Sequence, residues 1–312
     1  MKKHLFTGLC TAMVTPFIGN QVNYPLLELL IRRQIHAGVS AIVLAGTTGE
    51  APTLSDEEKL EIFRCGVTAA KGQCAVIAGT GSNDTGHTIR LSQAAQEIGV
   101  DGLLVVTPYY NKTTDAGLVR HYRQITEAVD LPVIAYNVPS RTGYDIPIHV
   151  YPALAQLPGI AGVKEASGDL SKLLRIMAQN GNDLPVWSGN DDLTVPTMSI
   201  GAQGVISVLS NVAPAHMNAM VHAALSGDYA LAGMLQRKLQ PLCDLMFCQV
   251  NPIPVKAAME AMEYHVGPCR MPLDGLTRKM PSGSTGIFVS LGKCLTVMVF
   301  DNIMKRNHAK VR

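Results

Sequence analysis

Short apolar, β-branched segments recur along the chain at intervals of roughly 20 to 35 residues, and each has about the length of a buried strand. They predict eight strands, over 9–17, 41–46, 75–81, 102–107, 132–136, 160–164, 185–188 and 204–208. Most segments between them have the apolar spacing of an amphipathic helix, most clearly over 24–37 and 55–70. Ser55 and Glu58 match the N-cap and N3 positions of a capping box.

Eight strand–helix units within about 225 residues predict a (β/α)₈ TIM barrel. A doubly wound open sheet is the alternative, but no GxGxxG or GxxxxGKS loop follows any predicted strand, so the nucleotide site typical of that fold lacks support. From about Asp228 onward helical patterns take over, through 231–247 and 254–264. We therefore expect a barrel over 1–225 and a C-terminal helical region over 226–312.

Composition narrows the class of protein. The chain has 312 residues, is 47% hydrophobic and carries a net charge of +2, with no cluster of Lys and Arg among aromatic residues, which argues against nucleic acid as a partner. Its seven cysteines form no CxxC pair, as expected of reduced thiols in the cytoplasm. The apolar run 287–300 is short for a membrane span and contains Lys293, so we expect no transmembrane helix.

Lys164 ends the apolar segment 159–164, where a buried cation needs an explanation. Burial disfavours the ammonium form and lowers the pKa of a lysine, which makes the amine a nucleophile suited to Schiff-base chemistry. The alternative is a lysine that extends past the strand end and pairs with Glu165 or Asp169. The other residues at this end of the barrel decide between the two.

Active sites of such barrels lie at the C-terminal ends of the strands, and polar residues follow several of the predicted strands there. The second strand leads into a Gly/Thr-rich turn, the fourth into a pair of tyrosines, and the fifth ends in a tyrosine and leads to an arginine. Each could be only a turn, packing or solvated residue, but together with Lys164 they indicate one site. They are Thr47, Thr48, Tyr109, Tyr110, Tyr136 and Arg141.

These residue types fit a single reaction. A lysine imine needs a proton shuttle, which Tyr136 can supply with Thr47 and Tyr110 as relay partners. The carboxylate of an α-keto acid can be held by the hydroxyls of Thr47 and Thr48. Arg141 offers a planar, two-pronged donor for a second carboxylate.

Metal chemistry has less support. The nine histidines show no HxH or HExxH spacing and the cysteines lack zinc-site spacing, so we expect neither a metal nor another cofactor. His216 and His222 lie six residues apart and are interpreted as ordinary helix residues. Lys256 and Lys293 follow the last predicted strand, which makes them poor nucleophile candidates.

Three segments, GTTGE over 46–50, YNVP over 136–139 and GVKE over 162–165, together resemble the dihydrodipicolinate synthase and N-acetylneuraminate lyase family of pyruvate-dependent class I aldolases. The similarity runs from about residue 5 to 276. Within the family, 136–143 resembles the members whose arginine receives the carboxylate of the aldehyde substrate. Lyases that act on sialic or sugar acids usually differ there.

For the chemistry, the resemblance implies that Lys164 forms the imine with pyruvate and that Tyr136 is the central acid and base. Thr47 and Tyr110 would complete the proton relay, and Tyr110 would reach into the neighbouring subunit's site. Such proteins are usually cytoplasmic homotetramers, arranged as dimers of dimers. The implied product is (4S)-4-hydroxy-2,3,4,5-tetrahydrodipicolinate, which enters the diaminopimelate branch of lysine synthesis.

For binding, the resemblance implies that Thr48 holds the pyruvate carboxylate and that Arg141 receives L-aspartate 4-semialdehyde. Gly189 and Ile206 would line the site through main-chain atoms.

The chain departs from the family pattern in two places. Asn83 and Tyr109 match the site where lysine inhibits some members, but His87 replaces their acidic residue and Asp56 replaces a histidine. A glutamate would pair with the ammonium of lysine and a histidine would not, so lysine inhibition is left open. The second departure is an atypical tail from about 277, which replaces the family's usual amphipathic last helix.

Two other functions compete with the condensing lyase. One is a related aldolase that cleaves a sugar-derived keto acid, against which Arg141 argues. The other is a non-catalytic keto-acid sensor, which would need the carboxylate site but no proton relay.

Overall fold

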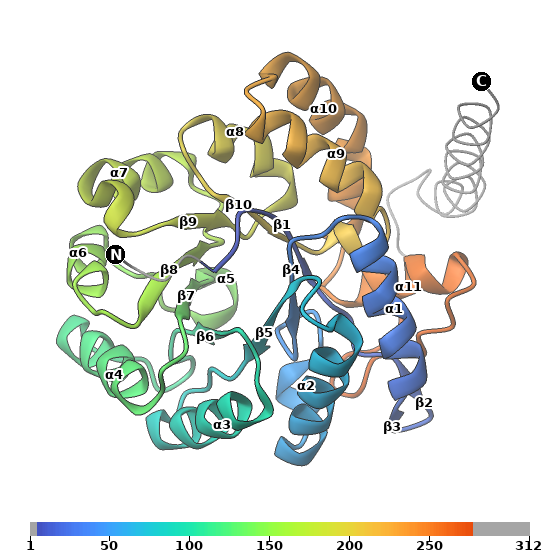
Figure 1. Cartoon of the computed structure of the whole chain (residues 1–312), viewed down its shortest axis with the longest axis horizontal. Helices are drawn as coiled ribbons and strands as arrows, with labels where there is room; N and C mark the ends of the chain where they lie inside the picture. Colours follow the sequence, from blue (N-terminus) through green and yellow to red (C-terminus); the bar gives the residue numbers. More distant parts are fainter. Residues whose placement is uncertain (1–4, 277–312) are drawn as a thin grey trace.

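The centre of the molecule is a closed barrel of eight parallel strands, seen in a computed structural model that describes residues 5–276 (Figure 1). Around the ring the order is β1-β10-β9-β8-β7-β6-β5-β4. Because β1 pairs with both β4 and β10, the sheet has no free edge, which confirms the predicted barrel and rules out an open doubly wound sheet. The strands are β1 (Gly8–Ala12), β4 (Ala41–Leu44), β5 (Ala75–Gly79), β6 (Gly102–Val106), β7 (Val133–Asn137), β8 (Ile160–Glu165), β9 (Val186–Ser188) and β10 (Gly204–Ser207).

A ring of helices surrounds the barrel (Figure 1). Between strands and after the last one lie α1 (Tyr24–His36), α2 (Asp56–Ala70), α3 (Thr85–Ile98), α4 (Asp115–Ala128), α5 (Pro139–Thr142), α6 (Tyr151–Ala155), α7 (Leu170–Asn180), α8 (Thr194–Ser199) and α9 (Pro214–Leu225). One-turn 3₁₀ helices occupy parts of the connections: Ala51–Thr53, Ile148–Val150, Gly181–Asp183, Asp191–Leu193 and Leu209–Asn211. The predicted C-terminal helical part consists of α10 (Tyr229–Met246), which packs on α8 and α9, and α11 (Ile253–Ala261).

Capping residues set the starts of the two helices that the sequence indicated most clearly. The side chain of Asn23 accepts a hydrogen bond from the Leu26 amide at 3.2 Å, ahead of α1. At α2 the predicted capping box is present: the Glu58 amide donates to Ser55 Oγ at 3.2 Å, and the Ser55 amide donates to the Glu58 carboxylate at 3.0 Å. Both helices are confirmed to within one residue at their ends.

The first predicted strand, 9–17, was wrong in its second half. β1 ends at Ala12, and the hairpin strands β2 (Phe17–Ile18) and β3 (Gln21–Val22) pair with each other outside the barrel. Pro16 has no amide hydrogen to donate to a ladder, so the barrel strand cannot continue through it. The other barrel strands were predicted to within two residues at each end. The atypical tail from about 277 lies outside the described residues, and the boundary at 225 stays a prediction.

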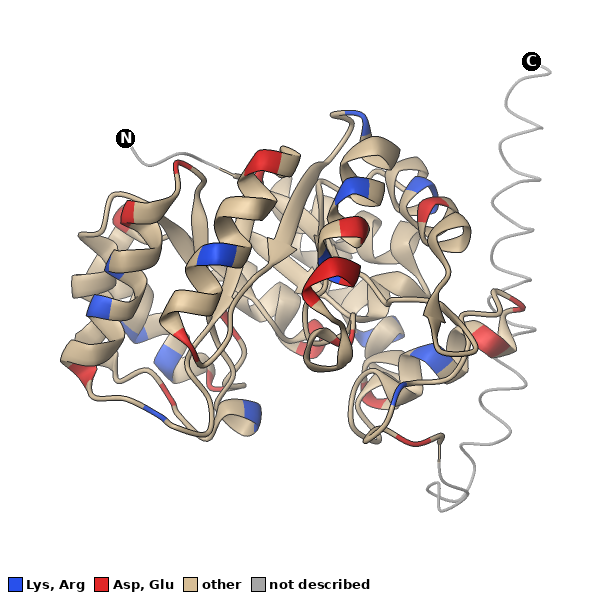
Figure 2. Cartoon of the chain, turned by 90° about the horizontal axis from the view of Figure 1, so that it is seen from below, with Lys and Arg blue, Asp and Glu red and all other residues tan. Residues whose placement is uncertain are grey.

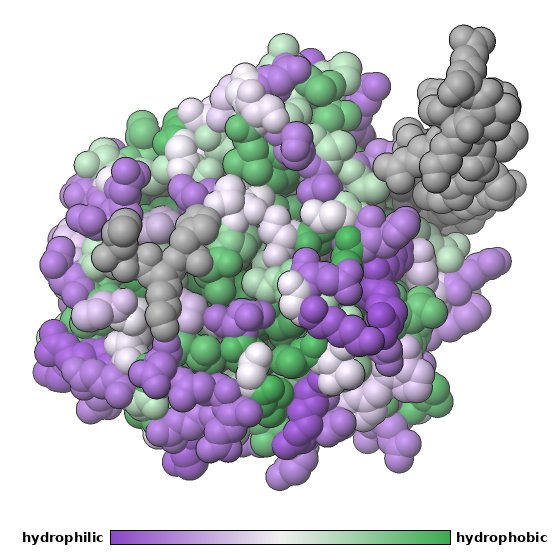
Figure 3. Space-filling view, viewed as in Figure 1, coloured by the Kyte–Doolittle hydropathy of each residue, from purple (hydrophilic) through white to green (hydrophobic). Residues whose placement is uncertain are grey.

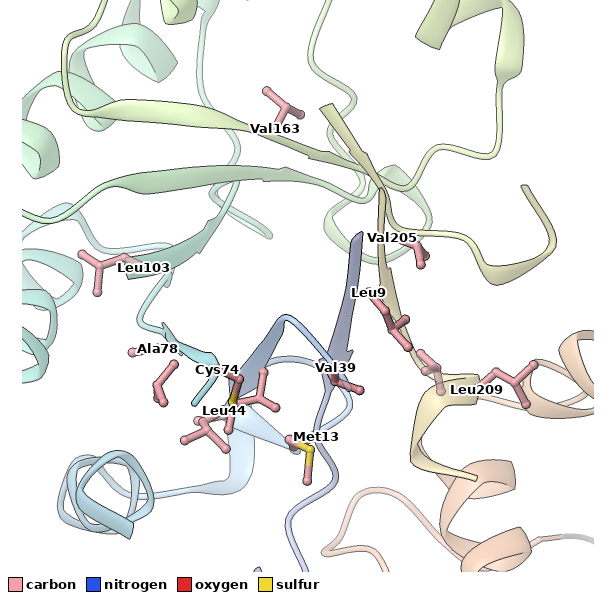
Figure 4. Packing of buried hydrophobic residues seen from close by; sticks show 14 of the residues in the cluster. Leu9, Met13, Val39, Leu44, Cys74, Ala78, Leu103, Val163, Val205 and Leu209 are labelled. Carbon is pink, nitrogen blue, oxygen red and sulfur yellow. The ribbon is translucent and has the colours of Figure 1, made fainter. Parts of the chain in front are cut away.

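Buried apolar side chains form two layers, because successive residues of a strand point to opposite faces. Leu9 and Val205 point toward the helices, where they join the larger cluster between barrel and helix ring (Figure 4). Their neighbours Cys10 and Ile206 belong to the smaller cluster inside the barrel. Both layers are tightly buried, so the strand ends are held in fixed positions for the site above them.

Two aromatic rings fill the barrel interior near its N-terminal end. Phe6, just before β1, stacks on Trp187 of β9 with ring centroids 4.8 Å apart. Gly162 of β8 makes room for the indole, because a Cβ there would lie 2.6 Å from a Trp187 ring atom. Trp187 is also the register partner of Lys164 in the β8–β9 ladder. The interior below Lys164 is therefore packed with side chains and is not a channel.

The outer surface mixes charges of both signs. Lys and Arg alternate with Asp and Glu over the outer helices (Figure 2), as expected from the net charge of +2. Viewed along the barrel, hydrophilic side chains gather toward the rim and apolar ones nearer the middle (Figure 3). Between residues 5 and 276, none of the helices has the length and apolarity needed to cross a bilayer.

Candidate active site

A cavity of about 570 Å³ opens at the C-terminal ends of the barrel strands. Its wall includes Ala45, Gly79 and Val106, which end or directly follow β4, β5 and β6. A barrel of this kind carries its active site at this end. Of the residues singled out from the sequence, those that line the cavity are Thr47, Asn83, His87, Tyr109, Tyr136 and Arg141.

Lys164 and Tyr136 face each other across neighbouring strands; Tyr136 lines the cavity, whereas Lys164 is buried and is not one of its lining residues. They are register partners in the β7–β8 ladder, and the Lys164 Nζ lies 4.3 Å from the centroid of the Tyr136 ring. Lys164 is 5% exposed, and no ion pair of its ammonium occurs within residues 5–276. The alternative in which it pairs with Glu165 is wrong, because strand alternation turns Glu165 to the opposite face. Lys164 is thus a buried amine beside a phenol.

A buried polar network lies on the outer face of the same two strands. Asn137 Nδ2 donates to the Glu165 carboxylate at 2.9 and 3.1 Å and to Asp145 at 2.8 Å. Tyr151 donates to the Glu165 carboxylate at 2.6 Å, and burial followed by the Glu165 charge raises the pKa of Tyr151 well above its usual value. Lys172 forms an ion pair with Asp145. This network joins β7 to β8 one residue beyond the Tyr136–Lys164 pair.

The two threonines after β4 have different surroundings. Thr47 lines the cavity, whereas Thr48 is 2% exposed and its Oγ1 accepts a hydrogen bond from Asn251 Nδ2 at 3.0 Å. The main-chain oxygen of Asn251 in turn accepts from Arg141 Nη2 at 3.1 Å. Asn251 lies between α10 and α11 and was missed by the sequence analysis. No local signal identifies a residue that meets its partner 203 positions away.

Two residues beyond Thr48, a buried ion pair fixes the same turn. Lys256 Nζ lies 2.9 Å from the Glu50 carboxylate, and the two side chains are 3% and 0% exposed. Lys256 also donates to the main-chain oxygens of Thr15 at 3.1 Å and Pro268 at 2.9 Å. Burial lowers the pKa of Lys256, and the Glu50 charge opposes that shift. Lys256 therefore anchors α11 to the turn that carries Thr48.

The segment around Arg270 binds the other carboxylate oxygen of Glu50. The Arg270 amide donates to Glu50 Oε2 at 2.7 Å, and its guanidinium forms a two-pronged pair with Glu58 at 2.7 and 2.5 Å. The guanidinium carbon also lies 4.4 Å from the centroid of the Phe17 ring. Arg270 thus joins helix α2, through Glu58, to the turn after β4, through Glu50.

Gly189 and Ile206 are not among the residues that line the main cavity. Directly after β9, the Gly189 amide donates to the main-chain oxygen of Glu165 at 2.7 Å. A Cβ at this position would lie 2.5 Å from the Ala166 Cβ, so a side chain does not fit. Ile206 of β10 is fully buried in the barrel interior.

Tyr110 does not join the cavity of its own chain. Its side chain is 91% exposed, and its φ of 69° lies in the left-handed region that residues other than glycine rarely adopt. The loop that holds it is attached to the cavity wall, because Asn111 Nδ2 donates to the main-chain oxygen of Asn83 at 2.9 Å. The backbone of the loop therefore presents Tyr110 away from the chain that carries it.

The outer part of the cavity contains the residues that depart from the family pattern. His87 Nε2 lies 2.7 Å from Asp56 Oδ2, and Lys59 Nζ lies 3.4 Å from Asp56 Oδ1. Burial raises the pKa of Asp56, but the hydrogen bonds and charges of His87 and Lys59 outweigh it, and the net pKa is below the usual value. Positions 56 and 87 therefore form a pair within the chain.

The arrangement combines an amine, a phenol and a hydroxyl with donors for anions. Such an amine can add to a carbonyl, and the neighbouring phenol can move the protons that imine formation requires. Arg141 supplies a cationic donor at the rim. Within the described part of the chain, no three His, Cys, Asp or Glu side chains are grouped as a metal site would need.

Comparisons with known proteins agree with this geometry. Residues 5–284 match the model of the dihydrodipicolinate synthetase family. The chain is 45% identical over 276 residues to the 4-hydroxy-tetrahydrodipicolinate synthase of Thermoanaerobacter sp. (strain X514), covering 88% of this chain and 93% of the relative. It is 39% identical to the dihydrodipicolinate synthase structure from Thermotoga maritima, with a TM-score of 0.87 and coverage of 93% and 97%. A similar structure, described as a monomeric dihydrodipicolinate synthase variant, is 38% identical with a TM-score of 0.87 and coverage of 93% and 95%.

Proposed function

The chain belongs to the dihydrodipicolinate synthetase family, and from this membership we infer that it is a 4-hydroxy-tetrahydrodipicolinate synthase. It is a lyase that condenses pyruvate with L-aspartate 4-semialdehyde, in lysine biosynthesis through diaminopimelate. The observation that carries this function is the buried Lys164 amine, which has the Tyr136 ring beside it and forms no ion pair within residues 5–276. The lysine supplies the electrophilic imine itself, so the reaction needs no further cofactor.

In the proposed mechanism, the neutral Lys164 amine attacks the C2 carbonyl of pyruvate and water leaves as the imine forms. Tyr136 donates the proton that this water takes away, and Thr47 and Tyr110 relay protons to and from it. Tyr136, which has given up its proton, then takes one from the methyl carbon, and an enamine results. The enamine carbon attacks the aldehyde, and the amino group of the bound aldehyde displaces Lys164 to close the ring. The support for these roles is the position of Tyr136 and Thr47 on the cavity wall.

Two groups of donors are assigned to the two carboxylates. Thr48 holds the carboxylate of pyruvate, and Arg141 receives that of the aldehyde. Gly189 and Ile206 complete the site through main-chain atoms. The support for this division is that Arg141 is an exposed residue that lines the cavity, whereas Thr48 is buried directly after the cavity-lining Thr47.

A second subunit completes the site in this proposal. Tyr110 is exposed on its own chain and reaches the cavity of a neighbour across a tight dimer interface. Two such dimers form a homotetramer. The cytoplasm is the proposed location, on the sequence argument that seven cysteines form no disulfide framework.

The outer part of the cavity is proposed as the effector site, lined by Asn83, Tyr109 and His87. Because His87 is paired with Asp56 and offers no carboxylate, we expect L-lysine to bind weakly there. Initial rates measured with and without millimolar L-lysine test this expectation. Strong inhibition would show that other carboxylates, such as Asp84 on the same wall, receive the ammonium.

The central experiment is borohydride trapping. The protein is incubated with pyruvate and borohydride, and its intact mass is measured beside that of Lys164→Ala. We expect a pyruvate adduct on the wild type alone, followed by product formation when L-aspartate 4-semialdehyde is supplied. No adduct on folded wild-type protein would overturn the lyase and favour a keto-acid sensor. An adduct with turnover of a sugar-derived keto acid instead would favour the related aldolase.

A further inference from the structure

We propose that Asn251 is a positioning residue for the two carboxylate-binding side chains, Thr48 and Arg141. This inference rests on the proposed function, because it concerns the binding of the two substrates named there. Asn251 lies in the C-terminal helical part, is 5% exposed, and contacts the barrel loops through two different groups. Its side chain donates a hydrogen bond to Thr48, and its main-chain oxygen accepts one from Arg141.

The side-chain contact determines what the Thr48 hydroxyl can do. A hydroxyl has one hydrogen to donate, and its oxygen accepts through lone pairs. Asn251 Nδ2 donates to this oxygen at 3.0 Å, and no acceptor for the Thr48 hydrogen occurs among the described residues. A carboxylate can only accept, so Thr48 binds it as a donor. Asn251 therefore keeps the hydroxyl in the state that binds the keto-acid carboxylate.

The main-chain contact limits the motion of Arg141. One of its guanidinium donors is held by the Asn251 oxygen at 3.1 Å, which leaves the remaining donors for a carboxylate. Fixing a long, exposed side chain before the substrate arrives reduces the entropy lost on binding. The same residue thus sets the positions of both anion-binding groups.

Asn251 is itself held by a second link between the same two parts of the chain. Five residues further on, Lys256 pairs with Glu50, which lies two residues after Thr48. The Asn251 Oδ1 is buried and has no hydrogen-bond partner among residues 5–276. An unpartnered buried acceptor is unfavourable for stability, so stability alone does not account for an asparagine at this position.

The test is the variant Asn251→Asp, which keeps the shape of the side chain but replaces its donor with an acceptor. The Thr48 hydrogen would then be donated to the new carboxylate and turned away from pyruvate, while the main-chain bond to Arg141 is unchanged. We expect the pyruvate concentration at half-maximal borohydride trapping to rise about 10- to 100-fold. The KM for the aldehyde should change less than about threefold, because that subsite is retained.

A double-mutant cycle separates this effect from simple charge repulsion. In a Thr48→Val background there is no hydroxyl to orient, so Asn251→Asp should change half-maximal trapping less than about threefold. The matched control is Asn180→Asp, which alters another buried asparagine, 8% exposed and bonded to the Ile176 oxygen at 2.7 Å, away from the cavity. It should lower the melting temperature and leave trapping unchanged. If Asn251→Asp does not fold, Asn251→Ala takes its place, because it removes the donor without adding a charge. The pyruvate concentration at half-maximal trapping is measured and judged in the same way.

The outcomes distinguish the two proposals. If wild type is trapped and the Asn251 variants need more pyruvate for half-maximal trapping, the role of Asn251 is supported. Trapping with the same half-maximum in wild type and both Asn251 variants overturns that role and leaves the lyase standing. Absence of trapping on folded wild-type protein overturns the lyase and the role of Asn251 with it.

Discussion

The side-chain amide of Asn137 donates to both carboxylate oxygens of Glu165, at 2.9 and 3.1 Å, across neighbouring strands of the barrel. Each of these residues directly follows a member of the reactive pair, Tyr136 or Lys164, and the two pairs are consecutive steps of one ladder. Because side chains alternate between faces, the outer pair fixes the register that holds the inner pair together.

Replacing Asn137 should therefore affect both stability and catalysis. We expect Asn137→Leu to lower the free energy of unfolding by about 2–4 kcal/mol, because Glu165 and the Ile146 amide lose a buried partner. Urea denaturation measures the stability, and kcat measures the disturbance of the reactive pair. The exposed ion pair on α2 provides the control, where Glu61→Gln should change stability by less than about 1 kcal/mol. Unchanged stability of Asn137→Leu would contradict the argument.

Removing one partner of the buried Glu50–Lys256 pair should lower the free energy of unfolding far more than removing both. Lys256→Met leaves the Glu50 carboxylate buried without a cation, and should lower the free energy of unfolding by about 3–5 kcal/mol. The double variant with Glu50→Gln should recover part of that loss. Urea denaturation of both single variants and the double variant gives the coupling energy, with Lys71→Met as an exposed control. Strictly additive effects would show that the pair is not coupled.

The buried His121 should make the fold sensitive to acid. Burial lowers the pKa of His121 to about 4, below the value of about 6.5 expected for an unfolded chain. Between these values the unfolded chain binds more protons, so stability is fully present above pH 6.5 and falls as the pH drops toward 4. The loss reaches about 3 kcal/mol by the pKa difference.

The measurement is the free energy of unfolding of wild type and His121→Gln between pH 7 and 4.5. The variant should show a weaker dependence on pH than wild type over this range. His36→Gln alters an exposed histidine and should leave the wild-type slope unchanged. Equal slopes in wild type and His121→Gln would rule out His121 as the source.

Subunit complementation tests the proposed sharing of Tyr110. Lys164→Ala and Tyr110→Phe homo-oligomers should each have low activity. When their subunits exchange, a mixed dimer contains one site with both Lys164 and Tyr110 intact, so activity should return to about a quarter of the wild-type value. Mass spectrometry of the intact oligomers verifies exchange. Mixed dimers without recovered activity would mean that Tyr110 does not act in a neighbour's site.

The barrel and its reactive end were predictable because their signals are local. The strands are short and strongly apolar, and eight alternations of strand and helix without a nucleotide-binding loop favour the barrel over an open sheet. Lys164 is conspicuous because a cation ends an apolar run, and the tyrosines and threonines follow strand ends whose position in the fold is known in advance. The error at the first strand arose because the apolar pattern continues through Pro16, whereas the hydrogen-bonded ladder does not.

The contacts that support the site were not predictable in this way. Asn251 is 203 positions from its partner Thr48, and Lys256 is 206 positions from its partner Glu50. Asn251 and Lys256 both lie in the part of the chain that the sequence pattern places outside the barrel. Their partners depend on how α10 and α11 dock, which no spacing rule determines. Lys256 was set aside as a nucleophile from its position alone, and its pairing with Glu50 became visible only in three dimensions.

The stacking of Phe6 on Trp187 fills the barrel interior near its N-terminal end, opposite the end at which the cavity opens. In the proposed mechanism, pyruvate bound at Lys164 is the inner substrate, and the aldehyde that follows it lies between the imine and the solvent. The ring-closed product is then expected to leave through the cavity that Arg141 lines, by which both substrates are expected to enter. In that mechanism ring closure frees Lys164, so the product leaves the form of the enzyme that pyruvate binds, and product inhibition should be competitive with pyruvate rather than with the aldehyde.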